Sequence, residues 1–158
     1  MGKSGSGKSE AARFLAESHG LRLVKTGSIC RQIAILLFGN DNKGSTQVLD
    51  DALTQIDPSI FLRAALRGID QGENFIIDAL RFREDVAIAR DMGCMVLRVV
   101  AQPDLCLARL AGRGQAFDPE TDGHHRSEVE LDDAQVDLEI CNDGEMSAFL
   151  TRLTSIPV

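Results

Sequence analysis

The order of apolar and polar residues predicts short strands that alternate with helices along the chain. Four apolar runs have the length of buried strands, at residues 21–25, 74–78, 95–101 and 137–141. Apolar residues between them recur at helical spacing, which predicts helices at 10–18, 28–38, 48–53, 57–66, 84–92, 103–110 and after 144. This alternation indicates an α/β fold with a parallel sheet covered on both faces.

Two segments lack the apolar periodicity of helices and strands. Residues 40–45 are polar and predict a loop. Residues 112–128 are rich in Gly, Asp, His and Arg, which predicts a loop or a short lid. No repeat or linker divides the chain, so we expect one domain over residues 1–158.

Residues 2–9 match the phosphate-loop pattern G-x-x-x-x-G-K-[ST] at every position. The match comprises Gly2, Lys3, Ser4, Gly5, Ser6, Gly7, Lys8 and Ser9. Glycines in this pattern let the backbone turn its N–H groups toward a phosphate, at the positive end of the following helix. Lys8 is expected to bridge the β- and γ-phosphates of ATP, and the Ser9 hydroxyl to hold Mg²⁺.

A phosphate loop normally follows a strand at the centre of the sheet, but only Met1 precedes Gly2 in this sequence. An open central position leaves backbone groups of the neighbouring strands unpaired, at about 1–3 kcal/mol per group. Three explanations are open: the start lies upstream, the fold tolerates a missing first strand, or another segment fills its place. We expect the first, with the natural product extending upstream of Met1.

An acidic residue and several arginines predict the second half of the site. Asp78 ends an apolar strand, where it is expected to face the phosphate loop as a ligand of Mg²⁺-bound water or an acceptor of a substrate proton. A turn or helix-cap residue is the alternative. Arg81 has the chemistry to bind a phosphate, and Arg109 and Arg113, four residues apart, suit a lid over the transferred group; solvated surface arginines are the alternative.

Composition and charge exclude several classes of function. The chain of 158 residues has a net charge of −7 and only 4% aromatic residues, which disfavours nucleic acid and anionic membranes as partners. It shows neither a signal peptide nor an apolar run long enough to span a bilayer, so the expected location is the cytoplasm. The four cysteines are widely spaced and are expected to be buried and free, and the adjacent His124 and His125 do not have metal-ligand spacing.

Four segments together resemble the P-loop nucleoside monophosphate kinases, most closely the bacteriophage-type deoxynucleoside monophosphate kinases and the dephospho-CoA kinases. These segments are residues 2–9, 26–31, 78–82 and 137–144. The stretch His125-Arg126-Ser127-Glu128 is similar to a His-x-Ser-Glu stretch of the phage-type enzymes. The missing first strand and the short lid depart from the family pattern.

The resemblance implies a role for each of these segments. It assigns residues 28–72 to acceptor-binding helices and residues 112–128 to a short lid. Thr26, Gly27 and Arg31 would bind the acceptor phosphate, and Asp78 and Arg81 would flank the acceptor. Arg109 and Arg113 would be lid arginines, and Asn142, Asp143 and Gly144 would lie along the ATP base.

The implied reaction transfers the γ-phosphoryl group of ATP to a nucleoside or deoxynucleoside monophosphate, with Mg²⁺. Two alternatives remain open: dephospho-CoA as the acceptor, and nucleotide binding without turnover. A GTPase is disfavoured because no Asn-Lys-x-Asp motif is present.

Overall fold

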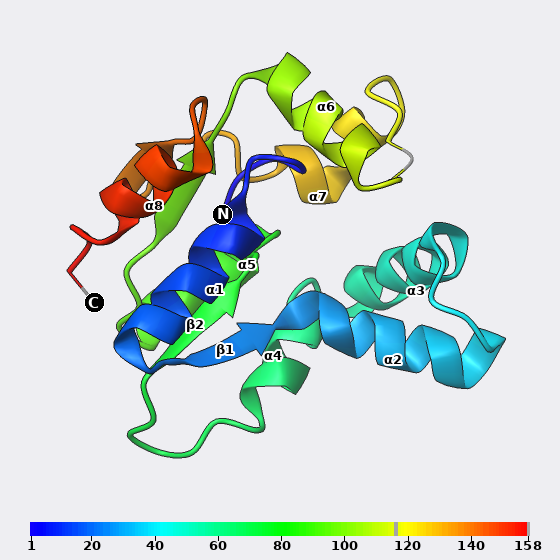
Figure 1. Cartoon of the computed structure of the whole chain (residues 1–158). Coiled ribbons are helices and arrows are strands. Elements are labelled where there is room, and N and C mark those ends of the chain that lie inside the picture. The colour runs from blue at the N-terminus through cyan, green and yellow to red at the C-terminus, as the bar shows by residue number, and fades with distance from the viewer. Residues whose placement is uncertain (116, 158) are drawn as a thin grey trace.

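The computed structural model describes residues 1–115 and 117–157, and Figure 1 shows how its elements are arranged. The strands are β1 (Arg22–Lys25), β2 (Phe75–Asp78), β3 (Leu97–Val100) and β4 (Leu138–Cys141). The helices are α1 (Lys8–His19), α2 (Thr26–Phe38), α3 (Lys43–Ile56), α4 (Ile60–Leu66), α5 (Arg83–Asp91), α6 (Pro103–Gly112), a 3₁₀ turn (Asp122–His124), α7 (Arg126–Val129) and α8 (Met146–Leu153). The predicted α/β class with parallel strands is confirmed.

The strands form two parallel pairs, as expected of a parallel sheet that lacks its first, central strand. β1 pairs with β2, and β3 pairs with β4. Met1 pairs with β3 as a residue of a parallel strand would. Its amine donates to the Leu97 carbonyl at 2.6 Å, and its carbonyl accepts from the Val99 N–H at 2.9 Å. One residue thus continues the ladder of β3 toward β2, which is not enough to join the two pairs.

The space between the two pairs is a cavity of about 690 Å³, which we call the β2–β3 groove. Its walls are apolar side chains of α1, β2 and β3, and the segment that leads into β3: Ala11, Ala12, Leu15, Phe75, Ile76, Ile77, Met95, Val96, Leu97 and Val99. Met1 lies in its lining as well. The predicted gap in the sheet is therefore a real feature of the fold.

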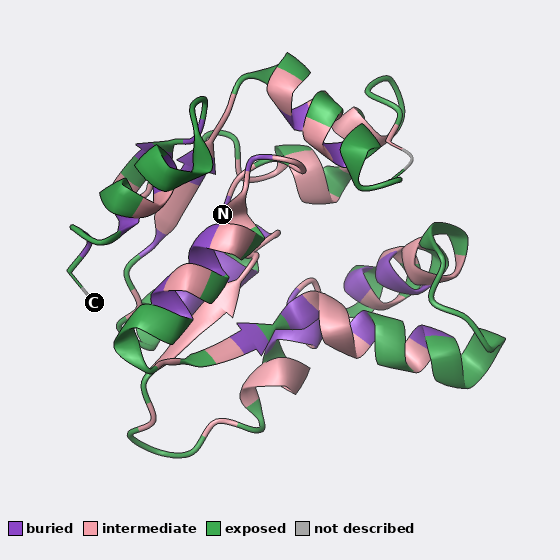
Figure 2. Cartoon of the chain, viewed as in Figure 1, coloured by how far each residue is buried: buried purple, intermediate pink, exposed green. Residues whose placement is uncertain are grey.

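Helices cover both faces of the strands, in three layers (Figures 1 and 2). On one face α1 and α8 enclose the main core: Ala11, Leu15, Val99, Ile140, Phe149, Leu153 and Ile156. On the other face Val86 of α5 packs with Met1 and Val96. The segment between α7 and β4 covers the same face, and the Arg98 guanidinium fastens it by donating to the carbonyls of Leu131 and Ala134 at 2.8 and 2.7 Å.

Helices α2, α3 and α4 form an arm beyond β1, here called the α2–α4 arm (Figure 1). Its core is a small cluster in which Cys30, Ala34, Leu49 and Phe61 are buried. Its far end is exposed, as Figure 2 shows, and carries the apolar side chains of residues 35–38. The arm is thus attached to the β1–β2 pair and projects from it.

Three expectations from the sequence need correction. Residues 40–45 are not all loop, because the Asn42 side chain accepts from the Ser45 N–H at 3.0 Å and begins α3 at Lys43. The segment 112–128 contains the 3₁₀ turn and the start of α7, in addition to loops. All four cysteines are free, but only Cys30 and Cys106 are buried, since Cys94 is half-buried and Cys141 exposed.

Within residues 1–115 and 117–157, none of the helices combines the length and apolar character that crossing a bilayer requires.

Candidate nucleotide-binding site

The phosphate loop turns tightly because its glycines adopt conformations that other residues avoid. Gly2, Gly5 and Gly7 have φ angles of 139°, 81° and 101°. A Cβ atom at Gly2 would lie 2.2 Å from the Val99 carbonyl oxygen, and one at Gly7 would lie 2.3 Å from Nδ2 of Asn142. These positions exclude larger residues both by backbone geometry and by lack of space.

Asn142 and Arg109 support the loop from the β4 and α6 side. Asn142 is 1% exposed, and its amide donates to the Ser6 carbonyl at 2.8 Å. Arg109 donates to the Asn142 carbonyl at 2.9 Å. In this structure Arg109 therefore holds the strand end behind the loop, although the sequence placed it in a lid.

The other residues predicted near the ATP base follow β4. The Asp143 carboxylate accepts from the Gln102 N–H at 2.6 Å, and Gly144 lies in the turn before α8. Arg113 lies just after α6 and is exposed. The lid role of Arg113 and the base-binding roles of residues 142–144 stay predictions.

Lys8, Ser9 and Asp78 meet where α1 begins and β2 ends. The Ser9 hydroxyl donates to Oδ1 of Asp78 at 2.9 Å, and the Lys8 ammonium donates to the Lys3 carbonyl at 3.0 Å. Burial lowers the pKa of Lys8, and the charge of Arg81 acts in the same direction, whereas Glu128 and Asp78 oppose it. The sequence thus anticipated the meeting of these three side chains.

The donor set beside the loop fits a magnesium ion. A hydroxyl and a carboxylate oxygen 2.9 Å apart are hard oxygen ligands of the kind that Mg²⁺ binds together with water and phosphate. Ser9 and Asp78 would hold the ion, which would neutralise charge on the phosphates.

A carboxylate already lies against the phosphate loop, and the loop's affinity for anions explains why. Glu128 of α7 accepts from the Ser4 N–H at 2.8 Å and from the Ser4 hydroxyl at 2.6 Å. Lys3 adds a hydrogen bond to the Glu128 carbonyl and an ion pair with Asp132. Sequence reasoning assigned no individual role to Glu128, although the His-x-Ser-Glu resemblance marked its position.

A second cavity, of about 220 Å³, opens between the α2–α4 arm, the segment after β2 and residues 117–128; we call it the acceptor pocket, after the role predicted for its residues. It brings together all four predicted acceptor-binding residues: Thr26, Gly27, Arg31 and Arg81. Thr26 donates to the Ala79 carbonyl at 3.3 Å, and Ala79 itself has a φ of 72°, a strained conformation that turns the chain sharply after Asp78. Arg31 has no hydrogen bond or ion pair with any residue that the structure describes, so its charge is available to a ligand.

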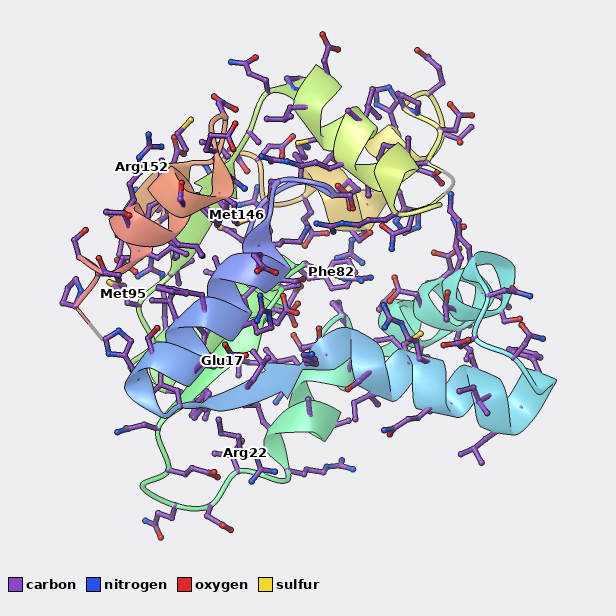
Figure 3. All side chains as sticks on the ribbon, in the orientation of Figure 1. Glu17, Arg22, Phe82, Met95, Met146 and Arg152 are labelled. Atoms are coloured by element: carbon purple, nitrogen blue, oxygen red, sulfur yellow. The ribbon has the colours of Figure 1, made fainter. Side chains whose placement is uncertain are left out.

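Two carboxylates organise Arg81 and its neighbours in the acceptor pocket. Asp85 accepts from the backbone N–H groups of Arg81 and Phe82 at 3.0 and 3.2 Å, which fixes the turn before α5. Asp50 of α3 lies 3.6 Å from the Arg81 guanidinium. Phe82 lies between the loop end of α1 and the α2–α4 arm (Figure 3), with the Arg126 guanidinium 4.8 Å from its ring centre.

The segment after α6 reaches across the acceptor pocket to α3. The His125 ring lies 2.9 Å from the Asp51 carboxylate, and Lys43 pairs with Asp122. Phe117, His125 and Glu128 line the pocket from this side. Residues 117–129 therefore lie along one side of the pocket; we call them the lid, after the role predicted for residues 112–128.

A phosphate loop, an oxygen-ligand pair and an arginine-lined pocket define a P-loop nucleotide-binding site. A family model described as an AAA domain matches residues 1–137. The chain belongs to this family of P-loop domains, which includes many kinases and supports a phosphotransferase in general terms. No curated protein matches the sequence.

Proposed function

We propose that this protein transfers the γ-phosphoryl group of ATP to a nucleoside or deoxynucleoside monophosphate. One observation carries the proposal: the acceptor pocket, with Arg31 and Arg81, shares the wall residue Glu128 with the phosphate loop. Glu128 both contacts Ser4 of the loop and lines the pocket. An anionic acceptor in the pocket would thus face a phosphate held by the loop.

The residues have distinct tasks in this reaction. An acceptor phosphate oxygen attacks the γ-phosphorus, and the bond to the bridging oxygen of ADP breaks. Lys8 and the loop N–H groups hold the charge of the donor phosphates, while Arg31 and Arg81 hold the acceptor phosphate. Asp78 positions the Ser9 hydroxyl. Most of the catalytic effect comes from alignment and charge stabilisation.

A panel of acceptors tests the proposal. The protein is incubated with ATP and Mg²⁺ and, separately, with each common ribo- and deoxyribonucleoside monophosphate and with dephospho-CoA, and ADP release is measured. Transfer to at least one monophosphate supports the proposal, and transfer to dephospho-CoA alone overturns it. A rise in Tm with ATP, without acceptor-dependent ADP release, would identify a nucleotide-binding protein without turnover.

Replacing Lys8 by Ala is the matched control for the panel. The Lys8→Ala variant loses a charge that contacts the donor phosphates, so we expect turnover to fall by about 1,000-fold or more. Its Tm should stay within a few degrees of the unmodified chain, because among the described residues Lys8 makes one hydrogen bond, to its own loop. Phosphoryl transfer that persists in this variant would contradict the assignment of the loop.

A further inference from the structure

Asp50 is a buried carboxylate that faces the acceptor pocket without a hydrogen-bond donor. It is 8% exposed and lines the pocket from α3. Its side chain accepts no hydrogen bond from any residue in the described part of the chain. The Arg81 guanidinium lies 3.6 Å away, which is too long for a hydrogen bond.

Such a carboxylate can accept from donors outside the protein, because its side chain keeps 11% exposure where it lines the pocket. Carboxylates buried to this degree are normally hydrogen-bonded in folded proteins. Burial accordingly raises the pKa of Asp50, despite the opposing charge of Arg81. A ligand that brings N–H groups to this wall would supply what the fold does not.

The placement of Asp50 favours the base of the acceptor over its phosphate. Arg81 lies 3.6 Å from Asp50, and its charge also acts on Lys8 of the phosphate loop. A phosphate bound at Arg81 would be repelled by the Asp50 charge if it moved farther in. The same pocket also carries the apolar side chains of Phe61, Leu62 and Phe117, which suit a flat base.

Asp50 also has a polar neighbour on the same helix face. Gln47 is three residues earlier in α3 and lines the same pocket. An amide and a carboxylate side by side can read a base edge that presents both an acceptor and a donor.

We propose that Asp50 selects the acceptor base by accepting hydrogen bonds from an exocyclic amino group. The protein would then prefer monophosphates of amino-bearing bases to counterparts that lack this group. This inference rests on the proposed function and names the substrate class of the same pocket.

Matched acceptor pairs test the inference. GMP and inosine monophosphate differ by one amino group, and AMP and CMP are compared with their oxo counterparts, inosine and uridine monophosphate. In at least one pair we expect kcat/KM to favour the amino-bearing acceptor by 10-fold or more. In Asp50→Asn the same ratio should fall below about 3-fold, because the amide offers only one acceptor oxygen. A ratio near one in every wild-type pair overturns the inference.

Two further comparisons separate base selection from a structural role. Asp51→Asn is the matched control, since Asp51 is next in sequence but contacts His125, and its ratios should match the wild type. If Asp50→Asn lowers kcat/KM equally for both members of every pair, Asp50 only positions Arg81 and the inference is wrong.

The proposed function and this inference can fail separately. If no monophosphate is phosphorylated, the proposed function fails, and the inference is decided by calorimetric binding of each pair to the wild type. Equal Kd values within every pair overturn it, and tighter binding of the amino-bearing member supports it. The same measurement decides the matter if Asp50→Asn does not fold.

Discussion

The phosphate loop and the β2–β3 groove both adjoin α1, yet they are built in opposite ways. In the loop, Gly2 and Gly7 leave no room for a methyl group, and Asn142 ties the backbone of Ser6 to β4. The groove, by contrast, is a cavity of about 690 Å³ lined by apolar side chains of β2 and β3. Packing is therefore tight in the phosphate loop and loose in the β2–β3 groove.

This difference bears on how the two proposed substrates would be positioned. The loop is fastened to the β3–β4 pair, whereas the acceptor pocket is built on the β1–β2 pair and the α2–α4 arm. Alignment between them depends on α1, on the Ser9–Asp78 hydrogen bond and on the lid contacts to α3. The groove separates these two halves, so filling it should change their alignment as well as stability.

The largest effect is expected from a variant in which a strand fills the groove. Five apolar, β-branched residues placed before Met1 should pair with both β2 and β3 and raise the free energy of unfolding by about 3–5 kcal/mol. Urea unfolding measures this, and hydrogen exchange should show newly protected amides in β2 and β3. A Gly-Ser extension of equal length is the control. Equal stability of the two extended chains would show that the groove does not accept a strand.

The Met1 amine should make stability depend on pH. Burial lowers its pKa from 8.0 to about 5. Between these values the unfolded chain binds the extra proton, so the free energy of unfolding should rise from pH 5 to pH 8, by up to about 4 kcal/mol. The chain must retain Met1, as checked by mass.

N-terminal acetylation is the control for this pH dependence, because it removes the titrating amine. Burial raises the pKa values of Asp50 and Asp85, but these groups are present in both the acetylated and the free-amine chain, so their contribution cancels in the comparison. Urea unfolding of both forms across this range gives the comparison. Parallel pH profiles would show that the amine is not buried.

Gly7→Ala should disrupt the tight packing of the phosphate loop. The new methyl group meets Asn142, and the backbone keeps an unfavourable φ of 101°, so we expect a loss of about 3 kcal/mol and of ATP binding. Gly20→Ala, at the other end of α1, also has a positive φ but nothing within 4 Å of the added carbon. It should cost about 1 kcal/mol and leave ATP affinity unchanged, as calorimetry can check. Similar losses in the two variants would argue against close packing at Gly7.

The smallest effect is expected at Glu128. Its carboxylate occupies loop donors that a phosphate would use, so Glu128→Gln should tighten ATP binding about 5-fold. Glu130→Gln removes a nearby carboxylate that contacts Arg83 and Arg126, not the loop, and should leave the affinity unchanged. Weaker binding in Glu128→Gln would mean that Glu128 supports the loop conformation.

Much of this arrangement could be predicted from local sequence. Each of the four strands lies within its predicted apolar run, and the glycine spacing of residues 2–9 located the loop because its chemistry is contained in eight consecutive residues. Asp78 was predicted to face the loop from its place at a strand end, and the Ser9 hydroxyl bonds to it.

Contacts between distant segments could not be predicted in this way. Glu128 reaches Ser4 across 124 residues, and Arg109 turns to Asn142, because the path of the chain after α6 decides both. The spacing of apolar residues along the sequence carries no information about that path. Asp50 was missed for a similar reason: in the sequence it is one acid on a helix, and only tertiary packing leaves it buried without a donor.

The lid is fastened at both of its ends to the β3–β4 half. Arg109 holds α6 to Asn142, and Arg98 clamps the carbonyls of Leu131 and Ala134. Between these anchors the lid reaches the α2–α4 arm through the Lys43–Asp122 and His125–Asp51 contacts, which are at least partly open to solvent. Under the proposed function, an acceptor that enters or leaves would part the Lys43–Asp122 ion pair and the His125–Asp51 hydrogen bond while the donor side stays in place. Salt weakens such contacts, so ionic strength should change the exchange rate of the acceptor more than that of ATP.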